Sequence, residues 1–256
     1  MSSNGHETAA ASGTFTLGGD LTINRMGFGA MRITGDGVWG EPDDIPNAHT
    51  VLKRVLELEV NFIDTADSYG PDVSEELIAA ALHPYPDGVI IATKGGMLRP
   101  GPGKWTADGR PEHLREALEG SLKRLKVERI DLHQYHRPDP EVPFEDSVGE
   151  FVKMREEGKI RHIGLSNVTT EQLATALDMV PIASVQNRYN IGDRESEDVL
   201  KMCEEKGIAF IPWYPVAAGK LEDPKVKEIA AKYDASPFQI ALAWLLKHSP
   251  VMLPIP

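Results

Sequence analysis

Four side chains able to hold or transfer a proton lie at or just after apolar, strand-like segments: Asp64, Tyr69, Lys94 and His136. A tyrosine can protonate a carbonyl oxygen during reduction if its pKa, normally about 10, is brought toward neutrality. A lysine ammonium within hydrogen-bonding reach would lower that pKa, and an adjacent carboxylate would keep the lysine charged in a partly dry pocket. A neutral histidine could then hold the carbonyl oxygen. These four residue types therefore suit the reduction of a carbonyl group by a hydride donor.

The chain alternates short apolar segments with amphipathic ones, which predicts parallel βα units. We expect strands at 25–30, 60–64, 89–93, 130–136, 160–165, 182–186, 208–212 and 251–255. We expect helices at 47–59, 74–82, 111–125, 144–157, 170–178, 196–205 and 224–247. Segments 14–17 and 21–24 flank a Gly-Gly-Asp turn and predict an N-terminal β-hairpin. The predicted fold is an α/β fold, a (β/α)8 TIM barrel.

An open, doubly wound sheet is the alternative to the barrel. It should carry a third glycine and a helix directly after its first strand, and the segment Gly27-Phe28-Gly29-Ala30-Met31 has neither. A barrel gathers functional side chains at the carboxyl ends of its strands. The Gly- and Pro-rich segment 95–110 follows the third strand, where barrels place functional loops, and we predict it to be irregular.

A series of motifs in chain order resembles those of the aldo-keto reductase family. Segment 61–70, with Asp64-Thr65-Ala66-Asp67-Ser68-Tyr69-Gly70, is similar to the signature around the catalytic Asp and Tyr. Segments 92–94 and 136–139 resemble the catalytic-lysine and catalytic-histidine strand ends. Segments 163–167 and 185–190 resemble those that hold the nicotinamide carboxamide, and 211–216 resembles the seventh strand with its stacking aromatic.

The resemblance implies an NADPH-dependent reductase of a small aldehyde or ketone. Tyr69 would be the general acid, Lys94 would lower its pKa, Asp64 would pair with Lys94, and His136 would orient the carbonyl. The implied cofactor-binding residues are Ser166, Asn167 and Gln186 for the carboxamide, Trp213 for stacking, and Tyr214, Pro215, Val216, Gly219 and Lys220 for the loop over the pyrophosphate. Segments 15–18, 27–31, 35–40 and 241–246 resemble a microbial branch that includes pyridoxal reductases.

Both ends of the sequence carry an expectation. Residues 1–13 are small and polar and predict a disordered tail, followed by the barrel over 14–256. The sequence ends at 253–256, where the family continues into a loop and helix that bind the adenosine 2′-phosphate. We therefore expect the barrel to lack its last helix and NADPH binding to be weaker.

Composition limits the remaining classes of function. The net charge of −12 argues against nucleic acid and membrane as partners. The single Cys203 excludes an intrachain disulfide, and the absence of an apolar leader-like segment indicates the cytoplasm. His133 and His136 are three positions apart on a predicted strand, so their side chains point to opposite faces and we expect no metal site. We expect a monomer or a small homo-oligomer that acts on a small-molecule carbonyl compound.

Two alternative functions stay open. A Schiff-base aldolase would use Lys94 as the nucleophile, but this requires a neutral lysine, and Asp64 would keep Lys94 protonated. A nucleotide-sensing or catalytically weakened relative would keep the fold and bind the cofactor with slow turnover.

Overall fold

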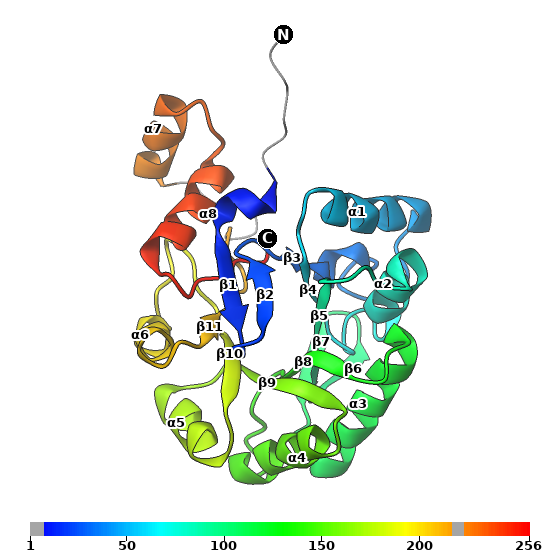
Figure 1. Ribbon diagram of the computed structural model, residues 1–256. Helices are drawn as coiled ribbons and strands as arrows, with labels where there is room; N and C mark the ends of the chain where they lie inside the picture. Colours follow the sequence, from blue (N-terminus) through cyan, green and yellow to red (C-terminus); the bar gives the residue numbers. More distant parts are fainter. Residues whose placement is uncertain (1–7, 217–222) are drawn as a thin grey trace.

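The computed structural model describes residues 8–216 and 223–256, and it has the expected alternation of strands and helices (Figure 1). Seven strands form one parallel sheet in the order β11-β10-β9-β8-β5-β4-β3. Their bounds are β3 (Phe28–Gly29), β4 (Phe62–Asp64), β5 (Ile90–Gly95), β8 (Ile130–Tyr135), β9 (Ile160–Ser166), β10 (Ile182–Gln186) and β11 (Ala209–Phe210). The sheet curls in the manner of a (β/α)8 barrel, as predicted.

Helices line the outer side of the curled sheet (Figure 1). They are α1 (Ile45–Glu57), α2 (Val73–Leu82), α3 (Pro111–Leu125), α4 (Phe144–Glu156), α5 (Thr170–Met179), α6 (Glu197–Lys206), α7 (Pro224–Lys232) and α8 (Pro237–His248). The apolar faces of α1 to α6 and of α8 pack on the sheet, whereas α7 packs on α8; Leu118, Phe151 and Leu200 are almost entirely buried between the two layers. This packing fixes the carboxyl ends of the strands, where the candidate site lies.

The predicted N-terminal hairpin is present as β1 (Thr14–Leu17) and β2 (Leu21–Asn24). Leu17 and Ile23 are fully buried, and they belong to a core cluster with strand residues such as Phe62 and Leu132. Because this cluster joins the hairpin to inward-facing strand residues, the hairpin covers one end of the barrel interior.

The predicted eighth strand forms only an isolated bridge, between Met252 and Phe210. Backbone hydrogen bonds still join this segment to both edges of the sheet. The Leu253 N–H donates to the Phe210 carbonyl at 2.8 Å, and the Gly27 N–H donates to the Pro254 carbonyl at 2.9 Å. Proline has no N–H to donate, so Pro254 cannot extend a regular ladder, but the ring of strands is closed.

Three other expectations need correction. The predicted helix 224–247 is two helices, because Ser236 caps a new helix and Pro237 occupies its first turn. Segment 95–110 contains an antiparallel hairpin, β6 (Met97–Gly101) with β7 (Lys104–Ala107). Part of the predicted disordered tail is ordered: Ala9–Ser12 forms a 3-10 helix, η1, in which Ala9 is buried and its N–H donates to the Leu58 carbonyl. A second 3-10 helix, η2, spans Ala30–Ile33.

Candidate active site

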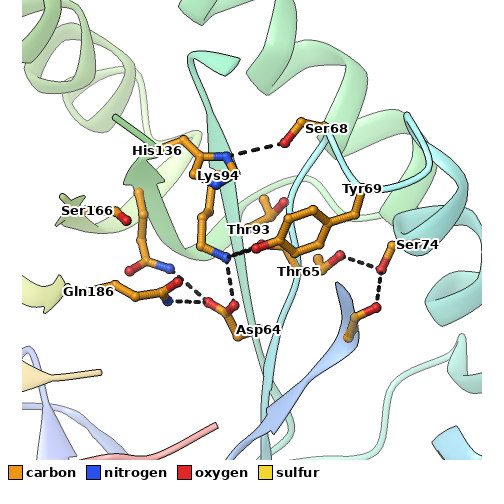
Figure 2. A network of polar contacts seen from close by, with 12 residues as sticks. Asp64, Thr65, Ser68, Tyr69, Ser74, Thr93, Lys94, His136, Ser166 and Gln186 are labelled. Carbon is orange, nitrogen blue, oxygen red and sulfur yellow. Dashed lines mark hydrogen bonds and ion pairs between the residues drawn. The ribbon is translucent and has the colours of Figure 1, made fainter. Parts of the chain in front are cut away.

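The carboxyl ends of neighbouring strands bring the predicted polar residues together (Figure 2). Asp64, Ser166 and Gln186 are the last residues of β4, β9 and β10. Lys94 lies near the end of β5, and His136 directly follows β8. Tyr69 enters the same space from the loop between β4 and α2.

Lys94 is the centre of a buried hydrogen-bond network. Its ammonium donates to Asp64 Oδ2 at 2.6 Å, to the Thr65 carbonyl at 2.8 Å and to the Tyr69 hydroxyl at 3.4 Å. The Lys94 side chain is fully buried and that of Asp64 is 2% exposed. Burial on its own lowers the pKa of Lys94, but the charge of Asp64 and the contact with Tyr69 together raise that pKa above its ordinary value. The lysine is therefore an ammonium at neutral pH.

Contrary to our expectation, the pKa of Tyr69 does not fall below its ordinary value. Burial of the hydroxyl raises the pKa, the Lys94 ammonium lowers it, and the net direction is upward. The contribution of Lys94 has the expected sign, but burial is the larger effect. Tyr69 is therefore protonated at neutral pH, which is the form that a proton donor needs.

His136 lies beside Tyr69, with their ring centroids 5.9 Å apart and the rings nearly perpendicular. Burial lowers the pKa of His136 well below its usual value, and the positive charges of Lys94, Arg137 and Arg99 add to this effect. The imidazole is therefore neutral at pH 7. Ser68 Oγ lies 3.3 Å from His136 Nδ1. When Ser68 donates this bond, Nε2 carries the proton and is able to donate to a carbonyl oxygen.

Asp64 is held by two glutamine amides as well as by Lys94. Gln134 Nε2 and Gln186 Nε2 donate to Asp64 Oδ1 at 3.0 and 2.8 Å. The amide nitrogen of Gln186 is thus engaged within the site. Sequence reasoning missed Gln134, whose only signal was a polar residue inside an apolar strand. A Cβ on Gly164 would lie 2.3 Å from Ser184 Oγ and 2.8 Å from Gln134 Cγ, so glycine leaves room for this polar layer.

Asn167 connects the histidine end of the site to the predicted stacking aromatic. Its Nδ2 donates to the His136 carbonyl at 3.0 Å and to Ser166 Oγ at 2.9 Å, and its Oδ1 accepts from Trp213 Nε1 at 3.1 Å. The backbone of Asn167 is left-handed, with φ of 59°, a conformation that asparagine tolerates. These bonds fix the Trp213 ring on the same side of the site as Ser166.

A cavity of about 880 Å³ opens at this end of the barrel and contains the site. Among the predicted residues, the cavity is lined by Asp64, Tyr69, His136, Ser166, Asn167, Gln186, Trp213, Tyr214, Pro215 and Val216. Gly219 and Lys220 lie outside the described residues. Lys94 is not part of the lining and contacts the Tyr69 hydroxyl from beneath it.

The donor set of the cavity fits the nicotinamide half of a dinucleotide. A carboxamide needs both hydrogen-bond donors and acceptors. Ser166 offers a hydroxyl that donates, and the amide oxygen of Gln186 has no partner in the described part of the chain. Trp213 is half-buried and lines the cavity, so it offers a flat surface for an aromatic ring.

Neither a metal centre nor a membrane span is found in the described residues. No group of three or more His, Cys, Asp and Glu side chains there is placed to hold a metal ion. His133 and His136 are separated, since the His133 ring packs on Phe151 of α4 with 5.2 Å between centroids, whereas His136 lines the cavity. Across residues 8–216 and 223–256, every helix is too short or too polar to cross a bilayer.

A curled parallel sheet with its polar residues at the carboxyl ends of the strands has the organisation of a (β/α)-barrel enzyme. Within that class, the site favours enzymes that transfer a proton, because a tyrosine hydroxyl lies within hydrogen-bond distance of a buried, ion-paired lysine. The family model for the aldo/keto reductase family matches residues 25–256. The chain belongs to this family and is an oxidoreductase.

Individual relatives cover most of the chain. An uncharacterized oxidoreductase of Schizosaccharomyces pombe is 53% identical over 250 residues, which cover 97% of this chain and 81% of the relative. The pyridoxine 4-dehydrogenase of Escherichia coli is 39% identical over 254 residues, which cover 96% of this chain and 88% of the relative. An aldo/keto reductase from Klebsiella pneumoniae, solved in complex with NADP and acetate, has a TM-score of 0.76 at 25% identity; the match covers 95% of this chain and 84% of that chain.

Proposed function

We propose that this chain uses NADPH to reduce a small aldehyde or ketone to the alcohol, with Tyr69 as the general acid and residues 14–256 as one catalytic domain. The observation that carries the proposal is the 3.4 Å contact between the Tyr69 hydroxyl and the buried Lys94 ammonium. Tyr69 lines the same cavity as His136. The NADP in the Klebsiella pneumoniae relative supports the choice of cofactor. When bound, NADPH supplies the hydride that a carbonyl carbon accepts.

Each polar residue of the site then has a separate task. His136 donates a hydrogen bond to the carbonyl oxygen and so orients the substrate. Tyr69 gives its proton to that oxygen as negative charge develops there. The Lys94 ammonium stabilises the resulting phenolate, and Asp64 keeps Lys94 charged and in place.

Ser166, Asn167, Gln186 and Trp213 would hold the nicotinamide. Asn167 acts indirectly, because both ends of its amide are bonded to Trp213, Ser166 and the His136 backbone. Tyr214, Pro215 and Val216 continue the cavity wall beyond the ring. We extend the proposal to Gly219 and Lys220 as the part of this loop that covers the pyrophosphate.

The charged state of Lys94 argues against the aldolase alternative. An amine attacks a carbonyl carbon only when it is neutral, and the ion pair with Asp64 raises the pKa of Lys94 against the effect of burial. Our first choice of test substrate is pyridoxal, an aromatic aldehyde, because the chain is similar to the pyridoxine 4-dehydrogenase of Escherichia coli.

Titration of the chain with NADPH, followed by tryptophan fluorescence with NADH in parallel, tests the cofactor part of this proposal. We expect saturable quenching in the micromolar range of NADPH, because Trp213 lines the cavity. Trp213→Phe should lose most of the quenching, whereas Trp244→Phe, which alters a ring outside the cavity lining, should keep it. Absence of binding by a folded sample would contradict the proposal.

A further inference from the structure

Arg99, on β6, joins its own hairpin to two separate loops at the substrate end of the cavity. Its Nε donates to the Lys104 carbonyl at 3.0 Å and its Nη1 to the carbonyls of Val38 and Ser68 at 2.7 and 2.8 Å. Its Nη2 donates to the Gly37 carbonyl at 3.0 Å. The residue is only 9% exposed, and no carboxylate in the described part of the chain forms an ion pair with it. This guanidinium is therefore used to hold backbone carbonyls in place.

The same guanidinium stacks on Trp105, with 3.6 Å between its carbon and the ring centroid. Trp105 is 38% exposed, lines the cavity, and meets Tyr69 and His136 edge-on, with centroids 6.3 and 6.4 Å away. Trp105 is thus a wall of the space in which a carbonyl compound would meet the tyrosine. The stacked guanidinium fixes the orientation of this wall.

The loop before α1 reaches the cavity in a strained conformation. Gly37 and Val38 both have left-handed backbones, with φ of 69° and 57°. That region is costly for a β-branched residue such as Val38 and persists only where surrounding contacts hold it. The two carbonyls of this turn are the ones that accept from Arg99. Val38 also lines the cavity, so the strain sets the shape of the substrate space.

We propose that Arg99 is a positioning residue that sets the size of the substrate space, because it holds the Val38 turn and the Trp105 wall against the Tyr69 loop. The inference rests on the proposed carbonyl reduction for its functional readout. It concerns only the substrate end of the cavity, since the hydrogen bonds of Arg99 in the described part of the chain all go to Gly37, Val38, Ser68 and Lys104, and none goes to Ser166, Gln186 or Trp213.

Arg99→Met removes all four hydrogen bonds and keeps an unbranched side chain. We expect the Val38 turn to relax and Trp105 to move, so that the space widens. The ratio of kcat/KM for naphthaldehyde to that for propanal should then rise about tenfold, the usual scale of selection by pocket size. The Kd for NADPH should stay at the wild-type value.

A second readout needs no activity. Hydrogen exchange measured by mass spectrometry should be faster in residues 35–41 of Arg99→Met, because Arg99 is the described side chain that holds the Gly37 and Val38 carbonyls. Arg110→Met is the matched control, since Arg110 is in the adjacent segment, is exposed, and pairs with Asp108 outside the cavity. It should leave both the exchange and the substrate ratio unchanged.

Two further variants keep the test decisive if Arg99→Met folds poorly. Arg99→Lys offers donors without a planar stacking face and should restore part of the protection. Trp105→Phe should raise the substrate ratio but leave exchange in residues 35–41 unchanged, because Arg99 still holds that turn.

An unchanged substrate ratio and unchanged exchange in the Arg99 variants would overturn the inference. Failure of the wild-type chain to reduce either aldehyde would contradict the proposed function instead. In that case the exchange comparison between Arg99→Lys and Arg110→Met still decides the role of Arg99: faster exchange in the Arg99 variant alone supports it, and equal exchange refutes it.

Discussion

Tyr69→Phe should abolish most carbonyl reduction while the fold and the cofactor affinity persist. The substitution removes one hydroxyl from the network and leaves Lys94 its two shorter bonds, to Asp64 Oδ2 and to the Thr65 carbonyl. The phenyl ring still fits beside His136 and Trp105. We therefore expect an unchanged thermal midpoint and an unchanged Kd for NADPH.

The magnitude of the loss follows from the geometry. At 3.4 Å, the unit charges of an ammonium and a phenolate attract each other by about 5 kcal/mol at an effective dielectric constant of about 20. Asp64, which binds the same ammonium at 2.6 Å, offsets part of this attraction. The remaining stabilisation, below about 5 kcal/mol, corresponds to a fall in kcat of about 10² to 10³-fold, within the usual contribution of a general acid.

The assay is the steady-state oxidation of NADPH with pyridoxal as the substrate. Tyr233→Phe is the control, because Tyr233 is 66% exposed on the surface and should turn over at the wild-type rate. If Tyr69→Phe keeps more than about a tenth of the wild-type kcat, Tyr69 is not the general acid that the mechanism requires.

Three other substitutions test separate parts of the account. Lys94→Met should lower kcat at least as much as Tyr69→Phe and should also lower the thermal midpoint, because Asp64 becomes an unpaired buried carboxylate; a near-normal kcat would refute the role of the ammonium. Trp213→Ala should weaken NADPH binding about 3- to 10-fold through lost stacking. The Kd is measured by calorimetry, because the substitution removes the fluorescent probe itself, and a Kd equal to that of the wild type would mean that another surface holds the nicotinamide ring. His133 is fully buried with neither ring nitrogen hydrogen-bonded, and burial lowers its pKa to about 3. The unfolded chain therefore binds a proton at His133 below about pH 6.5 that the folded chain does not, and the wild type should lose about 2 kcal/mol of unfolding free energy at this residue between pH 7 and 5. His133→Leu should lack that part of the loss in urea denaturation at the two pH values, and an identical loss would contradict the assignment.

The order of the strands and the ends that carry the site could be predicted from the sequence, because apolar segments and polar strand ends recur along it. The contacts of the site could not. Gln134 lies inside an apolar segment, and its bond to Asp64 depends on the curl of the sheet, which brings β4 and β8 residues to one interior. The pKa of Tyr69 depends on how far burial outweighs Lys94, which residue types alone do not give.

Irregular segments were the least predictable part of the fold. Segment 95–110 forms a hairpin because β6 and β7 pair with each other and Arg99 ties them to the Val38 turn, contacts between residues about 60 positions apart in the sequence. The expectation of a single helix at 224–247 rested on the apolar pattern and overlooked Ser236 and Pro237, which together form a local signal for the start of a helix.

The most direct test of carbonyl reduction by this chain is the fate of the hydride. The chain would be incubated with pyridoxal and NADPH deuterated at the ring position that delivers hydride, and the alcohol product analysed by mass spectrometry. We predict one deuterium on the carbon that was the carbonyl, with Tyr69→Phe forming the same labelled product far more slowly. Tight binding of NADPH without transfer of the label to pyridoxal or to any aldehyde of a broad set would contradict the proposed function.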